Sequence, residues 1–422
     1  MDKKLFHGAP ATLRGKGLGA SDGALSTTDA GHQGWSILRE QVSLPAAVLL
    51  RSALLHNLEW MRRFVAAYGV QLAPHGKTTM SPELFGLQLD AGAWGITVAT
   101  APQAREAWRA GARRLLIANQ LVGPANMAIV ADLLDAGDTE VFCLVDSADN
   151  ADALGRWFHA RGLRLDVLLE IGIAGGRTGV RDDAQAQAVV EAVACWPQAL
   201  RLAGVEVYEG VAGDEAGVRA VLRRSVETFQ RLRDGRAFGR VPALLTGAGS
   251  AWFDVVAEEF AALSGDVAAE IVLRPGCYLT HDVGAYRQAA TRIHAGNPVA
   301  RQMGTSLQPA LRLWAYVQSR PEPDKAIVGL GKRDAAFDAG FPVPALHYRP
   351  GDAAPADAAA HWQVAAMMDQ HAFLQVRADD DLRVGDMLCF DISHPCLTFD
   401  KWRHLLVVDD DHTVVDAVST QF

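Results

Sequence analysis

The chain has 422 residues, half of them hydrophobic and about a fifth charged, a composition typical of a folded protein with a large core. The net charge is −9, whereas nucleic-acid binding favours a basic face, so we expect no nucleic-acid partner. No apolar run approaches the roughly 18 residues of a membrane helix, and the N-terminus lacks the apolar stretch of a signal peptide. We therefore expect a cytoplasmic protein without a membrane partner. The five cysteines are scattered and form no CxxC motif, which argues against a disulfide framework.

The first part of the chain, residues 1–43, is rich in glycine and shows little periodicity. This pattern predicts an N-terminal arm that is flexible or draped over the surface, where it can pack on the C-terminal domain. The segment 44–50 is typical of a strand. Residues 52–68 repeat apolar side chains at helical spacing and stop before Gly69, which predicts an amphipathic helix.

Strands and helices then alternate along the chain. Strands are predicted at 70–74, 94–100, 113–119, 140–146, 164–172, 200–208, 242–247 and 268–274. Helices are predicted at 81–91, 101–110, 124–136, 148–161, 182–195, 214–233 and 250–263. Strict alternation indicates parallel pairing with crossover helices. Eight such units favour a closed (β/α)8 barrel over residues 44–285, with an open doubly wound sheet as the alternative.

The pattern changes after about residue 285. Short strand-like segments follow, and no long helical pattern is visible, so we predict a mostly β domain over 286–422. An Ala/Asp/Pro stretch at 350–360 predicts an exposed loop, and residues 409–412 predict a turn between the last two strands.

The first motif with possible chemistry is HGKTT at 75–79, directly after the first barrel strand. It is not a nucleotide-binding phosphate loop, because the required glycine five positions before Gly76 is Gln71. Active sites of barrels lie at the C-terminal ends of the strands. Lys77 there could form a Schiff base with an aldehyde cofactor, beside His75. The alternative is a solvated surface lysine.

Two glycine-rich loops follow the last two barrel strands, where barrels often bind phosphate. TGAGS contributes Thr246, Gly247, Ala248 and Gly249, and RPGCY contributes Gly276, Cys277 and Tyr278. The alternative for TGAGS is a plain glycine turn in which Ser250 caps the next helix.

Two further residues are expected at the same end of the barrel. Arg177, in GGRTG after the fifth strand, could bind a phenolate or carboxylate oxygen. Tyr208 ends the sixth strand, and its alternative role is packing within the barrel.

In the β domain, the sequence His394-Pro395-Cys396 offers two good zinc ligands. In an extended segment, residues two apart point the same way, so the two side chains would converge. Two protein ligands would leave positions open for substrate, as catalysis needs. The alternative is a buried cysteine beside an incidental histidine.

The segments PHGKTT, GGRTG, VEVYEG, TGAGS, RPGCY and SHPC occur in this order. Over roughly residues 44–420 the chain resembles the D-serine dehydratase (D-serine deaminase) and D-threonine aldolase group of fold type III pyridoxal-phosphate enzymes, which share the alanine-racemase-like barrel. The resemblance implies that Lys77 is the Schiff-base lysine. It places Arg177 near the phenolic oxygen of the cofactor and Tyr208 near its pyridine ring. The phosphate cradle would comprise Gly247, Ala248, Gly249, Gly276 and Tyr278.

The resemblance also implies that His394 and Cys396 hold Zn²⁺, or another divalent metal, beside the substrate. The aldolase branch tends to have aspartate at the second metal position, so Cys396 favours the dehydratase branch. The implied reaction removes water from a small D-3-hydroxy amino acid such as D-serine, giving a 2-oxo acid and ammonia. The family commonly forms head-to-tail dimers, so we expect a homodimer. The alternatives are a retro-aldol enzyme, a racemase for which no second base is identified, and a non-catalytic pyridoxal-phosphate carrier.

Overall fold

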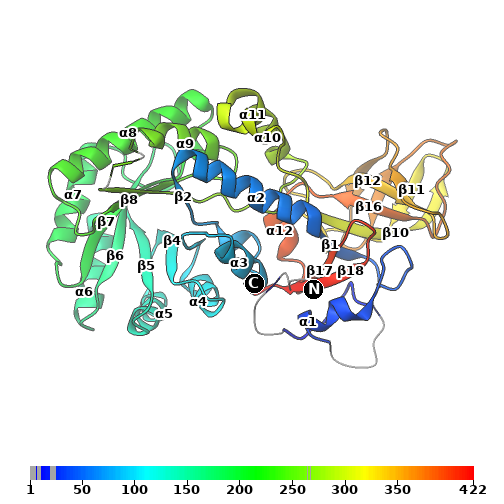
Figure 1. Ribbon diagram of the computed structural model, residues 1–422, viewed down its shortest axis with the longest axis horizontal. Coiled ribbons are helices and arrows are strands. Elements are labelled where there is room, and N and C mark those ends of the chain that lie inside the picture. The colour runs from blue at the N-terminus through cyan, green and yellow to red at the C-terminus, as the bar shows by residue number, and fades with distance from the viewer. Residues whose placement is uncertain (1–5, 7–10, 20–24, 264, 267) are drawn as a thin grey trace.

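The structure is a computed structural model that describes residue 6 and residues 11–19, 25–263, 265–266 and 268–422. It consists of a barrel and a separate β domain, with the short helix α12 (Pro395–Phe399) between them (Figure 1). The barrel strands are β2 (Gln71–Leu72), β3 (Ile96–Val98), β4 (Arg114–Gln120), β5 (Glu140–Val145), β6 (Leu165–Ile171), β7 (Leu200–Val207), β8 (Ala243–Gly247) and β9 (Ala269–Leu273). They pair in parallel in the order β2-β9-β8-β7-β6-β5-β4-β3. The predicted eight-stranded α/β barrel with a mostly β second domain is confirmed.

Contacts between the first two strands close the ring. The amide of Trp94 donates to the carbonyl of Leu72 (2.7 Å), and the amide of Thr97 donates to the carbonyl of Pro74 (2.9 Å). A parallel bridge joins His75 to Thr97. The predicted closed barrel therefore replaces the open-sheet alternative.

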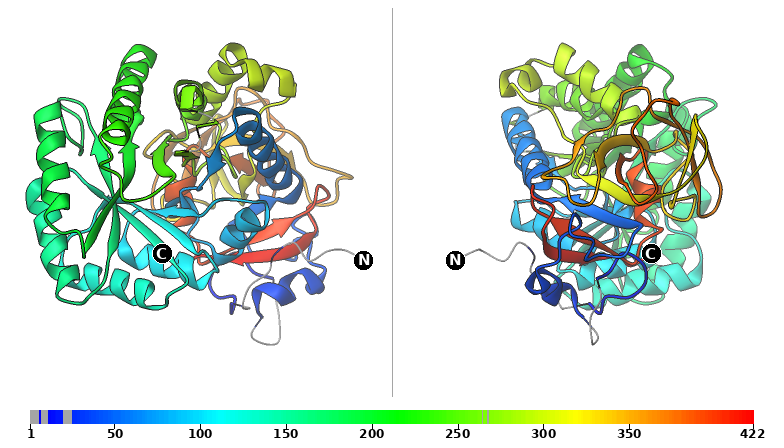
Figure 2. Two further views of the ribbon diagram at one scale, coloured as in Figure 1. Left: turned by 60° about the vertical axis from the view of Figure 1, so that its left-hand side comes forward. Right: turned by 90° about the vertical axis from the view of Figure 1, so that its right-hand side faces the viewer.

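The barrel helices lie outside the strands (Figure 2). They are α2 (Arg51–Tyr68), α3 (Pro82–Asp90), α4 (Ala101–Arg109), α5 (Pro124–Asp135), α6 (Ala148–His159), α7 (Asp183–Ala194), α8 (Glu215–Asp234) and α9 (Phe253–Phe260). Five of them begin at a residue whose side chain accepts a backbone N–H, namely Ser81, Thr100, Ser147, Asp182 and Asp214; such caps satisfy amides that the first helical turn leaves unpaired. None of the helices in the described part of the chain is long and apolar enough to cross a membrane.

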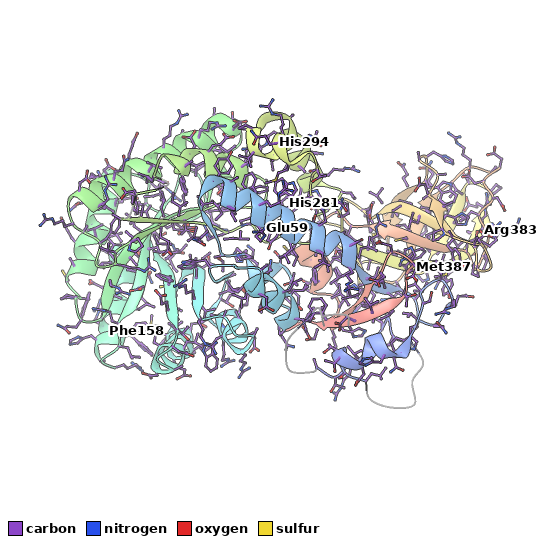
Figure 3. The ribbon with its side chains drawn as sticks, in the orientation of Figure 1. Glu59, Phe158, His281, His294, Arg383 and Met387 are labelled. Carbon is purple, nitrogen blue, oxygen red and sulfur yellow. The ribbon has the colours of Figure 1, made fainter. Side chains whose placement is uncertain are left out.

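Alternate residues of the barrel strands build two separate cores, because successive side chains of a strand point to opposite faces. One set packs inside the ring and comprises Ala73, Trp94, Leu116, Ala118, Phe142, Leu144, Leu168, Ala203, Leu244 and Val272. The other set packs against the helices, where Phe158 of α6 is fully buried. Figure 3 shows Phe158 at the far end of the barrel and Met387 within the β domain.

The inner core supports a stability prediction. Phe142 is fully buried inside the ring and stacks at a tilt on Trp94, with 5.7 Å between ring centroids. We expect Phe142→Ala to lower the free energy of unfolding by about 3–5 kcal/mol, because the strands cannot collapse into the cavity. Urea denaturation should then show a lower midpoint. The control Val122→Ala, at a side chain that is 63% exposed, should change stability by less than about 0.5 kcal/mol; equal shifts for both variants would contradict the prediction.

The β domain is built on a mostly antiparallel sheet. Its strands are β10 (Leu311–Glu322), β11 (Lys325–Val328), β12 (Val343–Tyr348), β13 (Ala356–Asp357), β14 (Gln363–Met367), β15 (Ala372–Gln375), β16 (Met387–Asp391), β17 (His404–Val408) and β18 (Val414–Ser419). The main path runs β13-β12-β16-β10-β1-β17-β18, where β1 is Ala46–Leu50, and β11, β14 and β15 continue from β10. The predicted turn at 409–412 connects the antiparallel strands β17 and β18.

Strand β1 (Ala46–Leu50) differs from the prediction, which placed it at the start of the barrel domain. It pairs antiparallel with β10, Ala46 opposite Trp314, and parallel with β17, Val48 opposite Leu406. A short apolar strand fits either sheet, so the sequence pattern alone does not reveal which one it joins.

The described part of the N-terminal arm packs on the β domain. Its helix α1 (Thr27–Ala30) contacts β18. Trp35 and Ile37 are buried in one cluster with side chains from β10, β16 and β17. These contacts come from isolated apolar residues in irregular backbone. Such residues show no helical or strand periodicity, so the sequence pattern does not reveal that they are buried.

Several elements after residue 280 were missed. Helices α10 (Ala285–Gly296) and α11 (Pro298–Met303) occupy a region for which no long helix was predicted, and β13 lies within the predicted loop 350–360. The buried residues of α10 are Ala290 and Ile293, too few to give a helical period. Strand β14 was not predicted either.

Candidate active site

A pocket opens at the C-terminal ends of the barrel strands and is closed on one side by α12 of the β domain. Most of the predicted site residues line it, namely His75, Lys77, Arg177, Tyr208, Ala248, Gly249, Gly276, Cys277 and Cys396. The others lie behind its wall. Thr246 donates to the carbonyl of Val272 (2.8 Å), and the Tyr278 hydroxyl accepts from Gln88 (3.0 Å). Gly247 and the ring of His394 also lie outside the lining.

Lys77 lies on a single turn, η2 (Gly76–Thr78), that directly follows β2. A side chain at Gly76 would approach Phe85 to 2.7 Å, so this turn requires glycine. Lys77 itself is exposed to the open pocket. Beside it, His75 Nδ1 is buried and has no hydrogen-bond partner. Burial lowers the pKa of His75 well below its usual value, so the ring is neutral and offers a free polar atom toward the site.

The last residues of the β domain hold the loop that follows Lys77. The amide of Gln421 donates to the carbonyl of Met80 (2.8 Å), and the hydroxyl of Ser419 donates to buried Glu83 (3.0 Å). Sequence reasoning missed these two contacts, because they join residues more than 330 positions apart.

On the opposite wall, the Arg177 guanidinium lies 4.8 Å from the centroid of the Tyr208 ring. The two predicted residues are therefore neighbours. Burial raises the pKa of Tyr208, so its hydroxyl remains protonated and can donate a hydrogen bond.

A buried ion pair, Glu206 with Arg274, lies at the base of the pocket. Arg274 also donates to the carbonyl of Val207 (3.2 Å). One oxygen of Glu206 and Nε of Arg274 have no partner, and burial raises the pKa of Glu206 to about 8. Sequence reasoning missed this pair. The available signal was a carboxylate within an otherwise apolar barrel strand, which is rare unless it is paired or functional.

The two glycine-rich loops lie side by side, and side chains already accept hydrogen bonds from their backbone amides. The Glu209 carboxylate accepts from the amides of Ala248 (3.2 Å) and Gly249 (2.6 Å). The Ser250 hydroxyl accepts from those of Gly276 (3.1 Å) and Cys277 (3.0 Å). Ser250 does not cap the next helix, because α9 begins at Phe253. Ser250 and Glu209 were absent from the predicted set.

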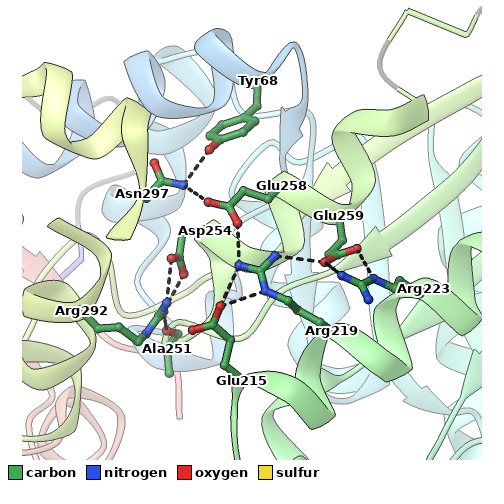
Figure 4. Close-up of polar contacts among 10 residues, drawn as sticks. All are labelled: Tyr68, Glu215, Arg219, Arg223, Ala251, Asp254, Glu258, Glu259, Arg292 and Asn297. Carbon is green, nitrogen blue, oxygen red and sulfur yellow. Dashed lines mark hydrogen bonds and ion pairs between the residues drawn. The ribbon is translucent and has the colours of Figure 1, made fainter. Parts of the chain in front are cut away.

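Polar contacts fix the first glycine loop from outside (Figure 4). Arg292 of α10 donates to the carbonyl of Ala251 (2.8 Å) and to both oxygens of Asp254 (2.6 and 2.9 Å). Its guanidinium also lies 4.2 Å from the centroid of the Trp252 ring. The helix missed from the sequence thus braces the loop that carries Ser250.

Two thiols face each other where the domains meet. Cys396 Sγ lies 3.6 Å from Cys277 Sγ and 3.4 Å from the Thr78 hydroxyl. Hydrogen bonds from Cys277, His394 and Thr78 lower the pKa of Cys396, while the same contact and burial raise the pKa of Cys277. The His394 ring also bonds to Asp338 through Nδ1 (2.8 Å).

The predicted extended geometry of His394-Pro395-Cys396 is wrong. His394 is extended, but Pro395 begins helix α12, as proline at a first helical position often does. The two side chains nevertheless interact, because Cys396 raises the pKa of His394 and His394 lowers that of Cys396. In the part of the chain that the structure describes, no three His, Cys, Asp or Glu side chains are already arranged to hold a metal ion.

Comparison with known proteins agrees with this architecture. Residues 50–279 match the family model "Alanine racemase, N-terminal domain", and residues 310–408 match "Putative serine dehydratase domain". A D-threonine aldolase from Arthrobacter sp. is 28% identical over 381 residues, covering 88% of this chain and 90% of that protein. D-threo-3-hydroxyaspartate dehydratase from Delftia sp. (strain HT23) is 31% identical over 166 residues, covering 39% and 43%.

Solved structures give the same result. D-threonine aldolase from Filomicrobium marinum superposes with a TM-score of 0.75 at 26% identity, covering 92% of this chain and 97% of that one. The Delftia dehydratase superposes with a TM-score of 0.71 at 22% identity, covering 92% and 99%. One structure of that dehydratase, a cysteine-to-alanine mutant, is described as metal-free. With more than half of its length matched by the first model, the chain belongs to the alanine racemase-like family of fold type III pyridoxal-phosphate enzymes.

Proposed function

We propose that this chain is a pyridoxal-phosphate- and metal-dependent lyase that removes water from a D-3-hydroxy amino acid and releases a 2-oxo acid and ammonia, as a D-serine dehydratase does. The observation that carries the proposal is that Lys77 of the barrel and Cys396 of the β domain line one pocket. A base and a soft metal ligand on two sides of one substrate suit the loss of a β-hydroxyl group.

The pocket fits the cofactor. His75 offers a buried, unpartnered nitrogen, and a side chain at Gly276 would lie 2.6 Å from the His75 carbonyl, so backbone alone lines that wall. When bound, the cofactor supplies an aldehyde for a lysine amine and a ring that withdraws electrons from Cα. Lys77 would hold the aldehyde end, Arg177 the phenolic oxygen, and Tyr208 the pyridine ring.

For the phosphate we propose Ser250, Gly276 and Cys277 as the principal contacts. The Ser250 hydroxyl can turn toward an anion and release the two amides that it now occupies, as phosphate-binding backbone requires. The amides of Ala248 and Gly249 stay with Glu209, whose burial raises its pKa.

Residues of this chain have two tasks in the proposed reaction: one moves a proton, and others hold the group that stabilises the developing charge. Lys77 Nζ takes the proton from Cα of the substrate. His394 and Cys396 offer the nitrogen and sulfur donors that zinc prefers, and Asp338 orients the imidazole. When bound there, a divalent ion would supply Lewis-acid chemistry for the departure of the hydroxyl group.

A retro-aldol reaction is the second candidate, favoured by the similarity to the Arthrobacter D-threonine aldolase across 88% of the chain. It would use the same lysine but take a proton from the β-hydroxyl and break the Cα–Cβ bond. A non-catalytic carrier is disfavoured, because the β domain places Cys396 in the pocket.

Product analysis separates these reactions. We expect D-serine, D-threonine or D-threo-3-hydroxyaspartate to give a 2-oxo acid and ammonia, with loss of product after chelation and recovery on addition of Zn²⁺. Glycine and an aldehyde would instead identify an aldolase. The absence of any product from the cofactor-loaded protein would overturn both proposals.

A further inference from the structure

The side chain of Cys277 is not needed for the phosphate contact proposed above. Its backbone amide points to Ser250 (3.0 Å), whereas its sulfur points across the pocket to Cys396. The residue is 3% exposed, and its sulfur also contacts the hydroxyls of Thr78 and Tyr286. A buried thiol in a polar corner, directed at another thiol, calls for a chemical explanation beyond packing.

The spacing of the two sulfurs matches a metal–thiolate site. Zinc binds thiolate sulfur at about 2.3 Å in tetrahedral geometry, which places two such sulfurs about 3.8 Å apart. Cys277 Sγ and Cys396 Sγ are 3.6 Å apart, so the ion could bind between them with little movement. The His394 ring, which lies two residues from Cys396 and close enough for Cys396 to raise its pKa, is the third donor within reach.

We infer that Cys277 is a third protein ligand of the divalent metal, completing a set of two thiolates and one imidazole. The inference rests on the proposed function, which assigns His394 and Cys396 to the metal. The two sulfurs are in direct contact, and the three side chains surround no ready-made metal centre. Metal binding would replace the hydrogens that join them. Three protein ligands leave one tetrahedral position open, the arrangement of catalytic zinc sites.

The inference has a structural consequence for catalysis. The backbone of Cys277 lies at the proposed phosphate site and its sulfur at the metal. One rigid loop after β9 would thus fix the distance between the cofactor and the ion. The β-hydroxyl of the substrate would occupy the open position, between Lys77 on the barrel side and Cys396 on the other.

Cobalt absorption tests the inference without measuring turnover. The full-length protein is reduced, stripped of metal and titrated with Co²⁺, whose thiolate charge-transfer band grows with the number of coordinating sulfurs. We expect one Co²⁺ per chain in the wild type. Cys277→Ser and Cys396→Ser should each lower the band to about half, and the double variant should abolish it. Cys195→Ser, at an exposed cysteine, is the matched control and should leave the band unchanged.

The opposite result is equally clear. A full-intensity band in Cys277→Ser, with one Co²⁺ bound per chain, would overturn the inference. Cys277→Ala and a circular dichroism spectrum for each variant separate ligand loss from misfolding. Failure of this inference and failure of the proposed function give different results. If the protein shows a two-thiolate cobalt site but releases no product from any D-3-hydroxy amino acid, only the proposed reaction is refuted.

Discussion

Replacing Lys77 with alanine is expected to abolish turnover and to leave no pyridoxyl group on the protein after borohydride reduction. In the proposed mechanism, the variant lacks both the amine that holds the cofactor and the base that takes the Cα proton. Loss of general-base catalysis alone costs about 10²–10⁴-fold in rate. Mass spectrometry of the reduced protein and steady-state assays of 2-oxo acid release provide the two measurements.

Lys325→Ala is a suitable control, because Lys325 pairs with Glu322 in the β domain and does not line the pocket. It should keep both the adduct and the activity. The assignment fails if reduced Lys77→Ala still carries a pyridoxyl lysine, because another amine would then hold the cofactor.

Cys396→Ala is expected to bind the metal too weakly to retain it through purification, and to lose the elimination reaction, while keeping the cofactor. Lewis-acid stabilisation of a leaving group contributes several kcal/mol, so we expect the rate to fall at least about a hundredfold. The proposed cofactor contacts lie on the barrel loops, whereas Cys396 belongs to α12 of the β domain, so the cofactor spectrum should not change. Elemental analysis gives the metal content. A metal-free Cys396→Ala protein with wild-type activity would refute the metal role.

The barrel was predictable because its signals are local. Each strand is a short apolar segment, and Gly92 and Gly111, which adopt positive φ, lie just after the ends of helices α3 and α4. The assignment of β1 was wrong because its partners, Trp314 and Leu406, are remote in sequence. Helix α10 was missed because few of its residues are buried.

The residues of the candidate site likewise include some with local sequence signals and some whose partners are remote in sequence. Lys77 was predicted from its position after a strand, and Cys396 from its spacing to His394. Glu209 and Ser250 were missed because their partners are amides of other loops, which carry no side-chain signature. The pairing of Cys277 with Cys396 spans 119 positions, and it depends on how the two domains meet.

The pairing of β1 with β10 and β17 means that the β domain is interrupted by the barrel in the sequence. During synthesis, β1 leaves the ribosome long before its two neighbours exist. At about 5–20 residues per second, the parallel partner β17 follows only after roughly 20 to 70 s. The barrel can fold in that interval. Until its partner strands have been synthesised, β1 has unpaired edges through which the nascent chain can aggregate. A chaperone that shields this strand in the nascent chain would therefore be expected to improve the yield of native protein more than faster folding of the barrel would.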